Sequence, residues 1–247
     1  MTRVLVTRPR EADELVSCLA AADIEAIHVP TIRVRPGEPG RLAAELRNRR
    51  DGDWTVITSA NGAAAVIEAL GKSAGMLAGR VVAIGPATAE ALRADGLRVD
   101  AVPVRSESSA IPAAMGNLAR RRVLLARGNL ATPRLAADLR AAGAEVVEVV
   151  AYRTVEGPPE SRPSLLAALD AGLDGLLFTS GSSARGLLRL LPAERRPAAH
   201  RVPAFCIGPA TAATARAAGF FVAAQAPEQT AAGLAAITIQ HFATERT

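Results

Sequence analysis

The hexapeptide Ile-Gly-Pro-Ala-Thr-Ala occurs twice in this chain, at residues 84–89 and again at residues 207–212. A Thr-Ser pair precedes each copy at a similar distance, within Ile-Thr-Ser-Ala-Asn-Gly at residues 57–62 and within Phe-Thr-Ser-Gly-Ser-Ser at residues 178–183. Matching residues lie about 120 positions apart, which indicates an internal repeat of one folding unit. We therefore expect two similar domains, with a ligand-binding cleft between them.

The repeat extends to the beginning of the chain, where residues 4–8 (Val-Leu-Val-Thr-Arg) resemble residues 123–127 (Val-Leu-Leu-Ala-Arg). A length of 247 residues allows two domains that each bury a core. The chain is 49% hydrophobic but only 3% aromatic, so Ala, Val, Leu and Ile must form most of the packing. This composition favours helices packed on a parallel sheet.

Short apolar runs alternate with longer amphipathic stretches, which is typical of βα units. The pattern predicts α/β architecture with two similar flavodoxin-like domains, each a five-stranded parallel sheet flanked by helices. The expected strands are residues 3–7, 25–29, 54–58, 80–84, 98–102, 122–126, 145–150, 174–178, 202–207 and 220–223.

Two segments rich in Pro and Gly, residues 31–40 and 152–163, begin as extended chain and are expected to be interdomain linkers. They allow two divisions of the chain. Either the domains are consecutive halves, or one domain is inserted into the other, with residues 1–30 joining residues 158–247. Periodicity does not choose between these divisions.

The formal net charge is +5, and nearly all the cations are arginines. Most of them, including Arg120 to Arg122 and the cluster Arg47, Arg49 and Arg50, are expected on solvated faces. The excess positive charge also favours an anionic partner. Nucleic acid is disfavoured, because no aromatic residues alternate with the basic ones. A polycarboxylate or phosphate ligand fits the composition better.

Cys18 and Cys206 lie far apart and have no metal-binding spacing, and the three histidines are scattered, so neither disulfides nor a metal site is expected. The sequence shows no signal peptide pattern at its N-terminus and no apolar run of membrane-spanning length. We expect a soluble, cytoplasmic and monomeric protein.

Each Gly-Pro-Ala-Thr sequence follows an expected strand and begins a helix. Gly85 and Gly208 permit a tight turn there, and the free N–H groups of the first helical turn can bind an anion. Thr88 and Thr211 add a hydroxyl group at this place. Hydroxyl groups at helix starts more often satisfy the helix itself, but the repetition of the same residues favours a ligand role.

Ser59 and Ser180 also lie where a strand ends and a helix begins, at the edge of a parallel sheet that usually binds ligands. Neither serine lies in a G-x-S-x-G nucleophile motif, so they are expected to form hydrogen bonds rather than attack a substrate. The chain has no dinucleotide-binding or P-loop glycine motif after its strands.

The ends of two further strands carry matching arginines. Arg127, followed by Gly128, can offer its guanidinium to a carboxylate, and Arg8 holds the same place in the first repeat. Tyr152 is the single tyrosine and falls in an expected linker. It either packs the hinge or faces the cleft, and the residues alone favour neither.

Taken together, these segments resemble the uroporphyrinogen-III synthase family. The resemblance rests on residues 6–9, 57–59, 83–89, 127–128, 150–154, 178–180, 207–212 and 226–234, which follow the order of the family across almost the whole chain. Gly181 departs from the pattern, since many members have proline there.

The resemblance implies the inserted division. One domain comprises residues 1–32 plus 156–247 and the other residues 36–151, and a two-stranded ladder of residues 33–35 and 152–155 joins them. It also implies a lyase without metal or organic cofactor, which cyclises the linear tetrapyrrole hydroxymethylbilane with inversion of ring D. An alternative is a catalytically silent relative that senses a tetrapyrrole or another polyanion. A flavodoxin-like nucleotide binder is a third interpretation.

Tyr152 matches the family's linker tyrosine and is expected to assist the departure of hydroxide as a hydrogen-bond donor. The other residues expected to contact substrate come from both repeats. They are Arg8, Ser59, Ala60, Asn61, Gly85, Thr88, Arg127, Gly128, Ser180, Gly181, Ser182, Gly208 and Thr211.

Overall fold

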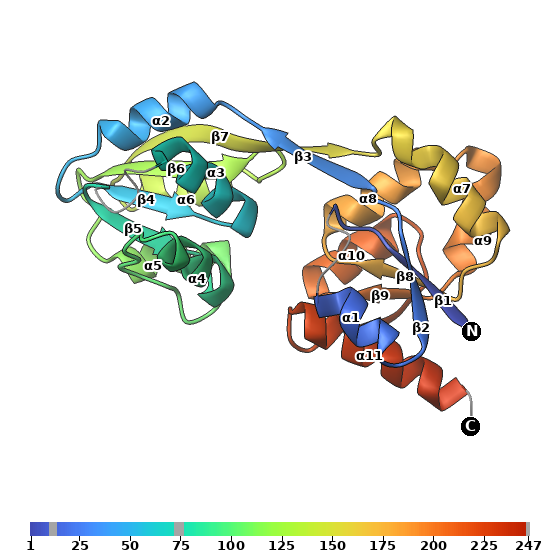
Figure 1. Cartoon of the computed structure of the whole chain (residues 1–247). Coiled ribbons are helices and arrows are strands. Elements are labelled where there is room, and N and C mark those ends of the chain that lie inside the picture. The colour runs from blue at the N-terminus through green and yellow to red at the C-terminus, as the bar shows by residue number, and fades with distance from the viewer. Residues whose placement is uncertain (10–13, 72–76, 246–247) are drawn as a thin grey trace. The chain divides into compact units, whose positions relative to one another are not determined.

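The structure is a computed structural model that describes residues 1–9, 14–71 and 77–245 (Figure 1). The chain divides into two compact units. Unit 1 comprises Met1–Arg33 and Val155–Thr247, and unit 2 comprises Val34–Thr154. Unit 2 is therefore inserted into the sequence of unit 1.

Unit 1 contains a five-stranded sheet of order β10-β9-β8-β1-β2 whose neighbouring strands pair in parallel. Its strands are β1 (Thr2–Val6), β2 (Ile24–His28), β8 (Gly175–Phe178), β9 (Ala204–Cys206) and β10 (Val222–Gln225). Its α-helices are α1 (Glu14–Ala20), α7 (Arg162–Asp170), α8 (Gly181–Leu190), α9 (Arg196–Arg201), α10 (Pro209–Ala217) and α11 (Ala231–Glu245).

Unit 2 contains a second five-stranded sheet, of order β3-β7-β6-β4-β5. Its strands are β3 (Ile32–Pro36), β4 (Trp54–Ile57), β5 (Arg80–Ala83), β6 (Arg122–Gly128) and β7 (Glu145–Glu156), and β4, β5, β6 and β7 pair in parallel. Its α-helices are α2 (Pro39–Arg47), α3 (Ala60–Leu70), α4 (Pro86–Ala94), α5 (Ile111–Met115) and α6 (Arg134–Ala141).

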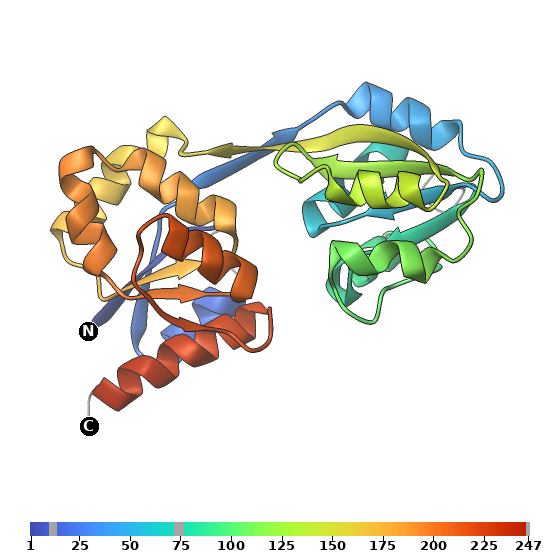
Figure 2. The same cartoon turned by 180° about the vertical axis from the view of Figure 1, so that it is seen from behind.

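Each sheet is covered by helices on both faces (Figures 1 and 2). In unit 1, Leu5 and Phe178 pack with α7 to α10, whereas Val4 and Leu177 pack with α1 and α11. Neighbouring residues of a strand point to opposite faces, so a strand buried on both sides is apolar throughout. Unit 2 repeats this arrangement, with α2, α3 and α4 on one face and α5 and α6 on the other.

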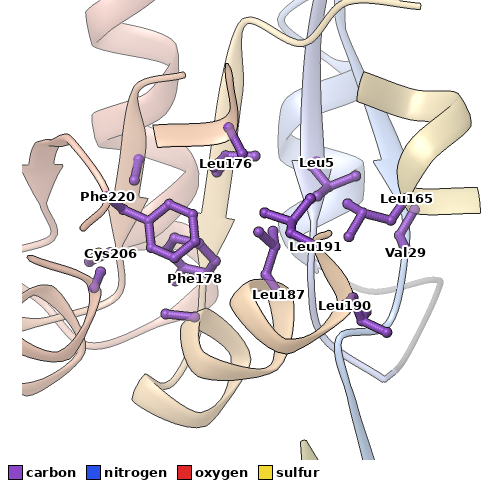
Figure 3. Packing of buried hydrophobic residues seen from close by; sticks show 14 of the residues in the cluster. Leu5, Val29, Leu165, Leu176, Phe178, Leu187, Leu190, Leu191, Cys206 and Phe220 are labelled. Carbon is purple, nitrogen blue, oxygen red and sulfur yellow. The ribbon is translucent and has the colours of Figure 1, made fainter. Parts of the chain in front are cut away.

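The few aromatic residues of the chain are concentrated in the core of unit 1. Phe178 and Phe220 lie with ring centroids 5.1 Å apart, and both side chains belong to the cluster that also contains Leu187 and Cys206 (Figure 3). The remaining volume of this cluster is filled mainly by leucine and alanine. This agrees with a composition that leaves the packing to aliphatic side chains.

One expected strand is not formed. Residues 98–102 form no strand but only an isolated bridge from Ala101 to Val82, so β5 is an edge strand of unit 2. Residues 32–36, expected to begin as extended chain, form β3, and β7 extends to Glu156. Backbone N–H groups of this Pro-rich segment form hydrogen bonds with β7. For example, the Gly37 N–H donates to the Ala151 carbonyl at 3.1 Å.

The expectation that Arg49 is solvated is wrong, because this residue is only 5% exposed. Its Nη2 donates to the Arg122 carbonyl at 3.4 Å, while Nε and Nη1 have no hydrogen-bond partner in the described part of the chain. Burial lowers the pKa of Arg49 to about 10. Sequence pattern missed this because the neighbouring Arg47 and Arg50 are exposed.

No helix within the described ranges is long and apolar enough to cross a membrane. The same residues contain no group of three or more His, Cys, Asp or Glu side chains placed to hold a metal ion.

Candidate functional site

The carboxyl edge of the unit 2 sheet brings together three residues expected at the site. Ser59 follows the end of β4, Gly128 ends β6, and Tyr152 lies on β7 directly opposite Gly128. The register of β6 against β7 shifts between Arg127 and Gly128. Parallel strands end at one edge of a sheet, so residues far apart in sequence meet there.

Tyr152 is fixed by two contacts of its side chain and one of its backbone. A Cβ atom added to Gly128 would lie 2.7 Å from the Cζ atom of the ring, so the phenol packs directly on the backbone of β6. The Asn129 N–H donates to the Tyr152 carbonyl at 3.2 Å. The Ser59 hydroxyl donates to the phenol oxygen at 3.0 Å. This single tyrosine is thus held at the beginning of a helix.

Ser59 also caps helix α3. Its Oγ accepts the Gly62 N–H at 3.0 Å, and its backbone is extended, as is typical of an N-cap residue. Ala60 and Asn61, the exposed first residues of the helix, have N–H groups without a partner inside the helix. The helix start therefore keeps donors for an anion beside the phenol.

A cavity of about 420 Å³ adjoins Tyr152 between helices α2 and α3. Apolar residues of these two helices form much of its wall, among them Leu42 and Ala65. Arg35 and Glu68 supply charges of opposite sign, and Asn61 and Tyr152 complete the polar part of the lining.

The Gly-Pro-Ala-Thr motif of unit 2 forms the start of α4, with Gly85 as its N-cap and Pro86 at the first helical positions. The backbone of Gly85 is extended, so a tight turn is not what requires glycine here. A Cβ atom at Gly85 would lie 2.5 Å from the Oγ of Ser106, so the close approach of this side chain requires it. Thr88 is nearly buried, at 6% exposure.

Unit 1 repeats these features with different partners. Ser180 caps α8 by accepting the Ser183 N–H at 3.2 Å, and its Oγ lies 2.9 Å from that of Ser182. A Cβ atom at Gly181 would lie 2.6 Å from Oγ1 of Thr214 on α10, so this departure from the family pattern coincides with close helix packing.

The second Gly-Pro-Ala-Thr copy has the same arrangement around Gly208. A Cβ atom at this glycine would lie 2.7 Å from the Cγ of Gln229, and Thr211 is 7% exposed.

Cys206 ends the preceding strand, and burial raises the pKa of its thiol to about 11. The thiol is therefore protonated at neutral pH and is not a nucleophile.

The two arginines at strand ends differ in their surroundings. Arg127 forms an ion pair with Glu148 at 2.5 Å and donates to the Thr132 carbonyl at 2.6 Å, so its guanidinium is bound within unit 2. Arg8 is half-buried after β1, and its carbonyl oxygen lies 2.6 Å from Nε2 of His28.

Ser106, Gln229 and Asn129 were not predicted from the sequence as residues of the site. Ser106 and Gln229 cover the two motif glycines from corresponding places in the repeat, about 120 residues apart, which comparison of the two halves could have revealed. Asn129 accepts the Thr154 N–H at 2.7 Å and so fixes the backbone just beyond Tyr152. The position of Asn129 directly after Gly128 was the feature of the sequence that could have indicated its role.

The family model described as uroporphyrinogen-III synthase HemD matches residues 13–236. A protein of Methanothermobacter thermautotrophicus, named "Putative uroporphyrinogen-III synthase", is 30% identical over 222 residues, covering 83% of this chain and 85% of the relative. The uroporphyrinogen-III synthase of Synechococcus elongatus is 27% identical over 195 residues, covering 76% of this chain and 74% of the relative.

Solved structures show the same fold. A mutant uroporphyrinogen III synthase of Thermus thermophilus has a TM-score of 0.70 at 20% identity, covering 99% of this chain and all of that one. The uroporphyrinogen-III synthetase of Helicobacter pylori has a TM-score of 0.65 at 15% identity, covering 98% of this chain and 100% of that one. Since the family model spans most of its length, the chain belongs to the uroporphyrinogen-III synthase family.

Proposed function

We propose that the chain cyclises hydroxymethylbilane, with loss of water and inversion of ring D, to give uroporphyrinogen III in tetrapyrrole biosynthesis. Membership of the family supports the reaction class. The observation that carries the proposal is the single tyrosine at the carboxyl edge of the sheet, held by Ser59 at the start of α3.

We propose that the carboxylates of the bilane bind at helix starts of both units. Ala60 and Asn61 in unit 2, and Gly181 and Ser182 in unit 1, supply backbone N–H groups, which suit carboxylates at a helix N-terminus. The helix starts at Gly85 and Gly208 would do the same, with Thr88 and Thr211 as hydroxyl partners. Arg8 and Arg127 would add guanidinium groups, and Arg127 would then exchange its pairing with Glu148 for a carboxylate of the substrate.

Tyr152 assists the departure of the leaving group. The bond between the hydroxymethyl carbon and its oxygen breaks, both electrons leave with the oxygen, and a proton from the phenol completes a water molecule. The electron-deficient carbon is then attacked by the substituted α-carbon of ring D, which gives a spiro intermediate. The bond from this α-carbon to the bridge carbon of ring C breaks, and the free α-carbon of ring D bonds to that bridge carbon and closes the macrocycle. The phenolate regains its proton when the rearranged macrocycle loses one from the ring carbon, so the enzyme is unchanged.

Selection of the inverted isomer needs a modest energy difference. Spontaneous closure gives the uninverted isomer, and a preference of about 100-fold corresponds to about 2.7 kcal/mol between the competing transition states. Binding the bilane with its terminal rings in one arrangement supplies such a difference through orientation alone.

The Tyr152→Phe variant tests the proposal. We expect turnover of freshly generated hydroxymethylbilane to fall on the order of 100-fold, because the acid is lost while the ring packing on Gly128 remains. Turnover and the ratio of isomers III and I are measured by chromatography of the oxidised products. Unchanged turnover of the variant would exclude Tyr152 from the mechanism.

The same assay separates the enzyme from a silent tetrapyrrole-sensing relative, which would bind the bilane without accelerating formation of isomer III. We further infer a cytoplasmic monomer with two domains, residues 1–32 plus 156–247 and residues 36–151. Residues 33–35 and 152–155 would form a two-stranded linker ladder between them. Light scattering and limited proteolysis test the oligomeric state and these boundaries.

A further inference from the structure

We propose that Ser59 is a positioning residue that orients the hydroxyl proton of Tyr152 toward the substrate. This inference rests on the proposed function, in which the phenol donates to the leaving oxygen. It assigns to Ser59 a role other than direct substrate binding. The hydrogen bond between Ser59 and Tyr152 joins the start of α3 to β7 inside unit 2.

The direction of the hydrogen bonds carries the argument. The Gly62 N–H donates to Ser59 Oγ at 3.0 Å, and the Ser59 hydroxyl donates to the Tyr152 oxygen at 3.0 Å. A serine hydroxyl has one proton, and Ser59 donates this proton in its hydrogen bond to the phenol oxygen. The phenol oxygen therefore acts as acceptor on the Ser59 side, so its own proton must point to another partner.

The Tyr152 hydroxyl has no second protein partner among residues 1–9, 14–71 and 77–245. Tyr152 is half-buried and is one of the residues that line the cavity between α2 and α3. Its proton is thus available to a bound molecule. Donation from Ser59 withdraws electron density from the phenol oxygen, and hydrogen bonds in such a chain strengthen one another, which makes the phenol a better donor.

The other repeat shows that this arrangement is not a general feature of the cap. Ser180 caps α8 as Ser59 caps α3, but its Oγ bonds to Ser182 instead of a phenol. The position related to Tyr152 by the repeat, about 120 residues earlier, is Thr31. Thr31 is fully buried, and its hydroxyl donates to the Ser183 carbonyl at 2.8 Å.

The ring of Tyr152 also packs on the backbone of Gly128, and this contact does not depend on the Ser59 hydroxyl. The substitution Ser59→Ala removes both the N-cap of α3 and the hydrogen bond to the phenol, whereas Ser59→Thr keeps a hydroxyl group for both. We expect kcat to fall roughly 10-fold with a smaller change in KM, since the interaction serves the transition state more than substrate binding.

The test combines kinetics with a double-mutant cycle in the full chain. Ser59→Thr keeps a hydroxyl and a good N-cap, so it restores most of kcat, whereas Ser59→Ala does not. In a Tyr152→Phe background, Ser59→Ala causes no further loss of kcat. Equal relative losses in both backgrounds, or full kcat in Ser59→Ala, would overturn the inference.

A spectroscopic measurement makes the test independent of turnover. The chain has one tyrosine, so the Raman tyrosine doublet reports on Tyr152 alone, and its intensity ratio distinguishes an accepting from a donating phenol. Ser59→Ala changes this ratio. Thr230→Ala, which removes a similar hydroxyl cap from the start of α11, leaves the ratio unchanged.

The outcomes separate the inference from the proposed function. If the wild-type protein fails to convert the bilane, the proposed function is wrong, while the Raman comparison still decides whether Ser59 donates to Tyr152. An unchanged Raman ratio in Ser59→Ala overturns the inference even when the wild-type enzyme is active.

Discussion

Tyr152 packs so closely on Gly128 that a Cβ atom at that glycine would lie 2.7 to 2.9 Å from atoms of the phenol group. Real Cβ atoms do not approach other heavy atoms so closely, so any side chain at this position must displace the ring. Because the hydroxyl of Tyr152 contacts Ser59, a shifted ring also loses this hydrogen bond. One glycine therefore controls the placement of the proposed catalytic phenol.

We expect the Gly128→Ala variant to lose turnover on the order of 10- to 100-fold, because small misplacements of a catalytic group are costly. Steady-state kinetics measure the effect, and circular dichroism checks that the fold persists. Gly40→Ala is the matched control, since nothing lies within 4 Å of its added Cβ atom at an exposed position of helix α2. Equal activity of the two variants would contradict the placement role of Gly128.

Thr88→Val and Thr211→Val should weaken substrate binding while leaving the fold stable. Valine has nearly the same shape as threonine, and both sites are almost buried, so the packing is kept and only the hydroxyl is lost. Loss of one hydrogen bond corresponds to roughly a 3- to 10-fold rise in KM or a reduced share of isomer III. If KM and the share of isomer III were unchanged in both variants, these hydroxyl groups would have no role in substrate recognition.

Thr55→Val should stabilise unit 2. Thr55 is fully buried on β4, and its hydroxyl has no hydrogen-bond partner among the described residues. Removing a buried hydroxyl without a partner, with little change of shape, relieves about 1–2 kcal/mol. Urea unfolding followed by the fluorescence of the single Trp54 measures the change. A loss of stability would show that the hydroxyl is satisfied, for instance by water.

Cys206 should make the stability depend on pH in alkaline solution. Burial raises the pKa of its thiol from 9.0 to about 11, so the unfolded chain loses this proton at lower pH than the folded protein. The contribution is fully present below about pH 9 and is lost as the pH rises toward 11. We expect the stability of wild type to fall more steeply over this window than that of Cys206→Ala. Parallel curves would contradict the expected shift.

The sheets were largely predictable because buried parallel strands are continuous apolar runs. Val4 to Val6 and Leu176 to Phe178 are fully buried, and their unbroken apolar pattern is visible in the sequence. Residues 98–102 (Arg-Val-Asp-Ala-Val) lack such a run, since polar and apolar residues mix there, and only Ala101 bridges to β5. Residues 32–36 were expected to begin as extended chain, but their own sequence does not identify the pairing partner β7, which lies more than a hundred residues away. Local sequence does not encode such contacts.

The candidate site was predictable in its motifs and less so in its contacts. The Thr-Ser and Gly-Pro-Ala-Thr sequences mark the helix starts, because capping follows local rules. The hydrogen bond between Ser59 and Tyr152 joins residues on different elements, so no spacing reveals it. Likewise, the ion pair of Arg127 with Glu148 depends on the register of β6 and β7, which only the folded sheet defines.

The two Gly-Pro-Ala-Thr copies are the same in sequence but are covered by different side chains, Ser106 over Gly85 and Gln229 over Gly208. A short hydroxymethyl group has one rotatable bond before its oxygen, whereas a glutamine side chain has three and sweeps a larger volume. A molecule approaching the second helix start must move a longer obstacle than at the first. Duplication has therefore kept the sequence of the motif while the side chain that covers it has come to differ in length and flexibility between the two units.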